Sequence, residues 1–172
     1  MKIKLAILDI DGIMTDGKKT YDLNGNVVSK TYCDKDFTAI KRLRASGTKV
    51  CFLSGCDKVN KAMAVNRNID FYYARGKDKA NFISHFCQVY DCSTDEMLYI
   101  GDDLFDLNIL KAVGHPYCPK DSPKIIQQNS FVLDRNAGEN LIAFLYDHLK
   151  EKGLVNDTTM EEIEKLDKRE IF

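Results

Sequence analysis

The chain alternates short apolar runs with segments of helical period, and this alternation limits the possible folds more than any other feature. The apolar runs have the length of strands and read KLAILDI, TKVCFLS, DFYYA, MLYIGDD and SFVLD. The segments of helical period read FTAIKRLRAS, VNKAMAVNR, ANFISHFCQVY and LFDLNILKAV, with a last helix at 140–152. Such alternation predicts a parallel sheet with helices on both faces, whose buried strands are almost continuously apolar. We therefore expect an α/β fold with a doubly wound, Rossmann-like parallel sheet.

One segment interrupts the alternation directly after the first strand. Between Thr20 and Tyr32, the dipeptide Asn24-Gly25 separates TYDL from VVSKTY. Asn-Gly between strand-like flanks is a strong signal for a β-hairpin, because both residues tolerate a positive φ. The sequence thus predicts a hairpin at about residues 20–32.

The length of 172 residues favours one domain, which we place at 1–152. The remaining tail, 153–172, contains DTTMEEIEKLDKREIF, with a helix start at Asp157 or Thr158 and acids in the first turn. This tail is expected to be either a short helix or a mobile arm.

Charge and cysteine content argue against several classes of partner. The chain has 25 basic and 26 acidic residues, so neither nucleic acid nor an anionic membrane is indicated. It lacks an apolar run of the roughly 18 residues that a membrane span needs. Its six cysteines form no CxxC pair, which favours reduced thiols. We expect a cytoplasmic protein that acts on a small molecule.

Acids and phosphate-binding residue types follow the predicted strands. In an open parallel sheet, ligands bind at the carboxyl ends of the strands, where these residues would meet. The segments concerned are Asp9-Ile10-Asp11-Gly12, Ser54-Gly55, Gly101-Asp102-Asp103 with Asp106, and the lysines Lys77 and Lys79 before the next helix. Taken singly, each segment also fits a turn, a helix cap or a solvated lysine. Their shared position at strand ends favours a catalytic site.

Several carboxylates at one point require a cation, because like charges disfavour one another. Oxygen ligands with room for phosphate suit Mg²⁺. Asp9 could then attack phosphorus, while Asp11 gives and takes the proton. Ser54, the Gly55 amide and a lysine would stabilise the charge on the phosphoryl oxygens.

At these residues the chain resembles the haloacid dehalogenase superfamily of phosphohydrolases, over roughly residues 1–150. It looks most like the capless subgroup that contains 3-deoxy-D-manno-octulosonate 8-phosphate phosphatase and nonulosonate 9-phosphate phosphatases. The resemblance implies a HAD-like fold and an aspartyl-phosphate intermediate on Asp9. It also implies Mg²⁺ bound by Asp9, Asp102 and the backbone carbonyl of Asp11.

The resemblance assigns further roles around the phosphoryl group. Ser54 would hold it and Lys79 would neutralise it, with Lys77 as the alternative lysine. Asp103 and Asp106 would support the site. The short intervals between these segments leave no room for a cap domain. Because the resembled subgroup is tetrameric through its hairpins, we expect a homotetramer.

The residues expected to contact substrate are Gly55, Lys35, Asp36 and Cys56, and several neighbouring positions depart from the resembled subgroup. Cys56, Phe37 and Glu139 stand where the subgroup has arginine or glycine, and cysteine does not replace the fork of an arginine. The expected substrate is a phosphorylated sugar or sugar acid of the 3-deoxy-ulosonate or nonulosonate type, with its identity open.

Two other functions stay open at this point. One is a non-catalytic tetramerisation module, similar to the carboxyl domain of sialic acid cytidylyltransferases. The other is a phosphatase that acts on macromolecules, which an open site would permit. The intact acids and Lys79 favour the small-molecule phosphatase.

Overall fold

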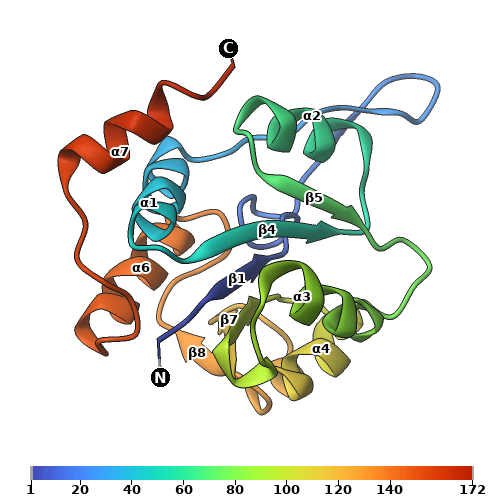
Figure 1. Ribbon diagram of the computed structural model, residues 1–172. Helices are drawn as coiled ribbons and strands as arrows, with labels where there is room; N and C mark the ends of the chain where they lie inside the picture. The colour runs from blue at the N-terminus through green and yellow to red at the C-terminus, as the bar shows by residue number, and fades with distance from the viewer. Residues whose placement is uncertain (1, 172) are drawn as a thin grey trace.

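A six-stranded parallel sheet forms the centre of the protein (Figure 1). The computed structural model describes residues 2–171. In spatial order, the strands are β5 (Asp70–Tyr73), β4 (Lys49–Ser54), β1 (Leu5–Leu8), β6 (Met97–Ile100), β7 (His115–Pro119) and β8 (Phe131–Leu133). The predicted doubly wound parallel sheet is confirmed.

Helices cover both faces of the sheet, because alternate residues of the buried strands point to opposite sides. Ala6 and Leu8 face a cluster with α1 (Asp34–Ala45), α2 (Lys58–Asn66) and α6 (Leu141–Glu151). Leu5 and Ile7 face a second cluster with α3 (Ile83–Tyr90), α4 (Leu107–Ala112) and α5 (Lys124–Gln127). Short 3₁₀ turns at Lys79–Phe82, Thr94–Glu96 and Leu104–Asp106 precede α3, β6 and α4.

Two elements were not predicted from the sequence. The strand β7 contains Pro116 and Pro119, and prolines argue against a central strand because they cannot donate to the ladder. It nevertheless pairs with both β6 and β8. The helix α5 is a single turn, too short for a visible apolar period.

The predicted hairpin is present and projects from the body of the protein (Figure 1). It consists of β2 (Thr20–Tyr21) and β3 (Val27–Ser29), which pair antiparallel as a separate sheet. Of the central dipeptide, only Gly25 has a positive φ, at 78°. The Asp22 carboxylate accepts hydrogen bonds from the amides of Asn24 and Asn26, so the turn is wider than a two-residue one.

Only the hairpin and α1 lie between β1 and β4, and only α2 lies between β4 and β5. Within residues 2–171 there is therefore no cap domain, as predicted. No helix in this range has both the length and the apolar character needed to cross a bilayer.

The tail contains the helix α7 (Met160–Asp167), which packs against α1. It begins two to three residues later than expected, because Thr159 and Glu162 form a capping box. The amide of Ile171 then donates to the carbonyl of Asn66 at 2.8 Å. Of the two expectations for the tail, the structure has the short helix; residue 172 lies outside the described residues.

Candidate active site

The acids and the phosphate-binding candidates meet at the carboxyl edge of the sheet, as expected. Asp9 follows β1, Ser54 ends β4, and Asp102 lies two residues beyond β6. The amide of Asp9 continues the ladder by donating to the carbonyl of Ile100 at 3.1 Å, which fixes where the side chain leaves the strand.

Lys79 connects two of the acids from within the protein. Its Nζ lies 2.7 Å from Oδ2 of Asp9 and 2.6 Å from Oδ1 of Asp106. Lys79 is buried, whereas the ammonium of Lys77 lies 5.8 Å from the Phe82 ring centroid. The structure therefore selects Lys79 over Lys77 as the lysine of the site.

Both carboxylate oxygens of Asp106 accept two hydrogen bonds, and Asp106 supports the structure of the site. Its Oδ2 accepts from the amides of Asp102 and Asp103 at 2.9 and 3.0 Å, and its Oδ1 accepts from Lys79 and the Tyr99 hydroxyl. Asp103 is exposed and caps the turn at Leu104–Asp106 through the Leu104 amide. Both residues hold the loop after β6 in shape.

Asp102 is placed differently, because one of its oxygens is buried without a hydrogen-bond partner among the described residues. A side chain at Gly12 would bring its Cβ within 2.1 Å of Asp102 Oδ2, so only glycine allows this close approach. Gly12 also has a φ of +84°, which glycine adopts without strain. An orphaned buried oxygen is expensive unless a donor or a cation completes it.

The site is a cluster of carboxylates whose negative charge is offset only in part by Lys79. Oxygens of Asp9, Asp102 and Asp106 lie within 4.8 Å of one another. Burial, followed by the charges of Asp9, Asp106 and Asp103, raises the pKa of Asp102 to about 8. Burial likewise raises the pKa of Asp9 to about 6, although Lys79 opposes the shift. Burial also opposes the charge of Lys79, but Asp9 and Asp106 outweigh it and raise its pKa.

These residues fit a divalent cation with a preference for oxygen. Asp9 and Asp102 are the carboxylates with lone pairs left to bind a metal, since the lone pairs of Asp106 all accept hydrogen bonds from other donors. Hard oxygen ligands of this kind suit Mg²⁺. The Asp11 side chain lies outside the three-carboxylate cluster, which agrees with a ligand role through its backbone carbonyl.

Asp11 is held by two residues that the sequence analysis missed. Lys30, at the exit of the hairpin, donates to Asp11 Oδ1 at 2.6 Å, and Asn60 donates to Asp11 Oδ2 at 3.1 Å. Asn60 also accepts from Lys30 and from the Tyr32 hydroxyl. The only sequence signals were a lysine after the hairpin and an asparagine one turn into the helix after Ser54, and neither signal is specific.

Ser54 is buried, and its Oγ accepts two hydrogen bonds. One comes from the Cys56 amide at 3.2 Å and one from the Asn60 side chain at 2.9 Å. Both interactions use the lone pairs of the hydroxyl, so its proton can be donated to an oxyanion. Gly55 and Cys56 follow at the mouth of the site, with open space beside Gly55.

The structure does not bring the other predicted substrate residues into this cluster. Asp36 was expected to bind substrate, but it is fully buried and its Oδ1 accepts from the Ala143 amide at 3.0 Å, in the first turn of α6. Asp36 is thus a helix cap, and the prediction is corrected. Lys35 is exposed on α1. Phe37 is buried under the guanidinium of Arg67, 3.9 Å from its ring centroid.

Comparison with known proteins places this geometry in a family. The profile of the family described as haloacid dehalogenase-like hydrolase matches residues 61–145. The chain is 30% identical over 122 residues to 3-deoxy-D-manno-octulosonate 8-phosphate phosphatase KdsC of Haemophilus influenzae, covering 70% of this chain and 67% of that protein. The chain belongs to the haloacid dehalogenase-like hydrolases. The sequence analysis matched Asp9, Ser54, Lys79 and Asp102 to the motifs of this family. In the fold, these four residues lie at the same edge of the sheet.

Solved structures of haloacid dehalogenase-like hydrolases have the same fold. The cobalt-bound form of the octulosonate phosphatase from Haemophilus influenzae matches with a TM-score of 0.82 at 28% identity, over 88% of this chain and 90% of that one. The enzyme from Moraxella catarrhalis, solved with magnesium, phosphate and KDO, matches in fold with a TM-score of 0.79 at 22% identity, over 86% of each chain.

Membership of this family makes the protein a phosphatase, as predicted. The structure from Moraxella catarrhalis contains magnesium, which is the metal expected for the site of this protein. The alternative of a non-catalytic tetramerisation module is not supported, since the relatives are enzymes and the cluster around Asp9 is complete.

Proposed function

We propose that the protein hydrolyses a small phosphorylated sugar or sugar acid in a Mg²⁺-dependent reaction through an aspartyl-phosphate on Asp9. The observation that carries this proposal is the position of Asp9 between Lys79 and Asp102, with Ser54 and Asp11 at the same edge. Bound to Asp9, Asp102 and the Asp11 carbonyl, Mg²⁺ would offset negative charge on the phosphate and the acids.

The first half-reaction transfers the phosphoryl group to the protein. A carboxylate oxygen of Asp9 attacks phosphorus while the bond from phosphorus to the leaving oxygen breaks. Asp11 gives its proton to that oxygen, so the sugar leaves as an alcohol. Lys79 holds Asp9 in place, and the Ser54 hydroxyl and the Gly55 amide donate to the phosphoryl oxygens.

The second half-reaction returns the protein to its starting state. Asp11 takes a proton from water, whose oxygen attacks phosphorus, and the bond to Asp9 breaks to release phosphate. Asp11 lies 2.6 Å from Lys30, which orients it for both proton transfers. Lys30 is therefore a positioning residue in this scheme.

The substrate class is proposed from the relatives, whose names specify 3-deoxy-D-manno-octulosonate 8-phosphate. An ulosonate or nonulosonate phosphate would present its phosphate to Asp9 and the rest of the sugar to Gly55 and Cys56 at the mouth. Cys56 supplies no cationic fork for a carboxylate, so we leave the particular sugar acid open. Lys35 was expected to contact the substrate, and its role stays a prediction.

We further propose a homotetramer assembled through the hairpin. Tyr21, Leu23 and Val28 are more than half exposed on the projecting hairpin, and Leu23 is fully exposed. Apolar side chains gathered on such a projection favour burial against another copy. We propose a cytoplasmic location as well, which the six free cysteines favour.

Two measurements test the proposed function. The first is a phosphate-release screen with Mg²⁺ over sugar phosphates, keto-acid phosphates and nucleotides, in which a sugar-acid phosphate should have the highest kcat/KM. The second is Asp9→Asn, which should lower turnover at least about 1,000-fold because the nucleophile is lost. Asp134→Asn is the matched control, since this side chain is 89% exposed and, within residues 2–171, pairs only with Lys120. Activity retained by Asp9→Asn would exclude the aspartyl-phosphate.

A further inference from the structure

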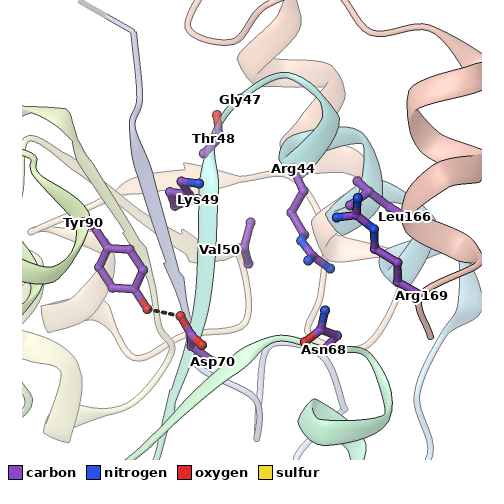
Figure 2. A pocket seen from close by; sticks show the side chains of 10 residues that line it. All are labelled: Arg44, Gly47, Thr48, Lys49, Val50, Asn68, Asp70, Tyr90, Leu166 and Arg169. Atoms are coloured by element: carbon purple, nitrogen blue, oxygen red, sulfur yellow. Dashed lines mark hydrogen bonds between the residues drawn. The ribbon is translucent and has the colours of Figure 1, made fainter. Parts of the chain in front are cut away.

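A second polar pocket lies at the opposite edge of the sheet from the active site (Figure 2). Its volume is about 450 Å³. Lys49 and Asp70, the first residues of β4 and β5, line it, whereas the active site is at the carboxyl ends of the strands. The tail closes one side of the pocket with Leu166 and Arg169.

Two guanidinium groups from distant parts of the chain face this pocket. Arg44 comes from the last turn of α1, and Arg169 follows α7 (Figure 2). Burial lowers the pKa of Arg44 and the positive charge of Arg169 adds to the shift, whereas the charges of Glu170 and Asp70 oppose it. The two cations are thus close enough to repel each other, and an anion between them would remove that repulsion.

The acids near the pocket already form ion pairs or hydrogen bonds with other residues. Glu170 accepts from Arg67 at 2.6 Å and from Lys41 at 3.0 Å. Asp70 accepts from the Tyr90 hydroxyl at 2.7 Å. Within residues 2–171, Arg169 forms no ion pair, and Arg44 donates only to the carbonyl of Arg67, at 3.3 Å. With Lys49, the lining carries three cations against one carboxylate.

We propose that this pocket is a second binding site, selective for a phosphate group, which is held between Arg44 and Arg169. The forks of two guanidinium groups match the oxygens of a phosphate, and charge-assisted hydrogen bonds of this kind are strong. The side-chain amide of Asn68 points its nitrogen toward Arg44 and can donate to the same group (Figure 2). Either inorganic phosphate or the phosphate of a small metabolite has the required chemistry.

Occupation of the pocket has a structural consequence for the tail. Because Arg169 belongs to the tail and Arg44 to α1, a bound phosphate bridges the two. A ligand that binds only the docked arrangement stabilises it by mass action. Bound phosphate therefore stabilises the docking of α7 and the residues after it on the core.

The test is a titration of the ¹⁵N-labelled full-length protein, followed by NMR. Inorganic phosphate should shift the side-chain signals of Arg44 and Asn68, and separately the Gly55 and Gly101 amides of the active site. Arg44→Gln, followed at Asn68, and Arg169→Gln, followed at Arg44 and Asn68, should each weaken the first response at least about ten-fold and leave the second unchanged. The matched control is Lys168→Gln, an adjacent exposed cation that does not line the pocket.

A second arm distinguishes the two sources of phosphate. Glucose 6-phosphate is titrated into the Asp9→Asn variant, which cannot hydrolyse it, and its affinity for the pocket is compared with that of inorganic phosphate. Saturation by either probe supports the site and identifies its source. If neither probe shifts Arg44 and Asn68, or if Arg169→Gln binds like the unmodified protein, the site does not exist, whatever the active site does.

Discussion

Lys30 Nζ lies 2.6 Å from Asp11 Oδ1 and 2.7 Å from Asn60 Oδ1, and the Lys30 side chain is fully buried. The ammonium therefore connects the exit of the hairpin to the residue that we propose as acid and base. Asn60 continues the connection to Ser54 at 2.9 Å. Residues on both sides of the phosphoryl site thus share one hydrogen-bond network.

Replacing Lys30 by methionine should lower kcat about 10- to 100-fold, because Asp11 loses the donor that orients it for proton transfer. KM should change much less, and Lys30→Arg should recover part of the activity. The matched control is Lys19→Met, since Lys19 lies 3.7 Å from Asp11 and is partly exposed. Equal losses in the two methionine variants would contradict a specific role for Lys30. Steady-state kinetics with p-nitrophenyl phosphate make the comparison.

Asp102→Asn should raise the Mg²⁺ concentration needed for half-maximal activity at least about ten-fold, because a charged ligand is lost. EDTA should stop the reaction of the unmodified protein and added Mg²⁺ should restore it. The neighbouring Asp103→Asn should keep the original Mg²⁺ dependence, since Asp103 is exposed and caps a turn. Turnover that persists in EDTA would be incompatible with the proposed mechanism.

The stability of the protein should carry a pH dependence that comes from Asp36. Burial raises the pKa of Asp36 from 3.8 to about 6, although the amides of Ala143 and Ile142 oppose the shift. The folded protein therefore holds more protons than the unfolded chain between these values. The contribution of Asp36 to stability is fully present below pH 3.8 and is lost as the pH rises through 6.

Asp36→Asn removes this titration while keeping an oxygen to accept from Ala143. Between pH 4 and pH 7, the variant should lose less unfolding free energy than the unmodified protein, by at most about 3 kcal/mol. Urea unfolding followed by circular dichroism at the two pH values measures the difference. Asp34→Asn, in the same helix but 99% exposed, should show no such change. Identical pH dependence in all three proteins would remove Asp36 as the cause.

Leu23→Asp should dissociate the proposed tetramer, because it places a charge on the fully exposed tip of the hairpin. Light scattering coupled to size-exclusion chromatography gives the mass. Met160→Asp replaces another exposed apolar residue, at the start of α7, and should leave the mass unchanged. A monomeric unmodified protein would disprove the hairpin assembly.

Much of the fold and part of the site could be read from local sequence. Strand and helix periods predicted five of the six sheet strands, and their order placed Asp9, Ser54 and Asp102 at one edge. These inferences succeed because burial on both faces makes a strand apolar, and because residues after parallel strands must meet. The strand β7 was not predicted because it contains Pro116 and Pro119, which argue against a strand that pairs on both sides, as β7 does.

Tertiary structure decided what depends on contacts between distant residues. The choice of Lys79 over Lys77, the link of Lys30 to Asp11 and the capping role of Asp36 each rest on a hydrogen bond that sequence spacing does not specify. The docking of the tail beside Arg44 also depends on contacts that sequence spacing does not specify. By itself, the sequence determined the strands, the sheet edge and the chemical types of the residues gathered there. The tertiary structure decided which of those groups are paired, buried or left with an unsatisfied oxygen, because only packing fixes distances between side chains far apart in the chain.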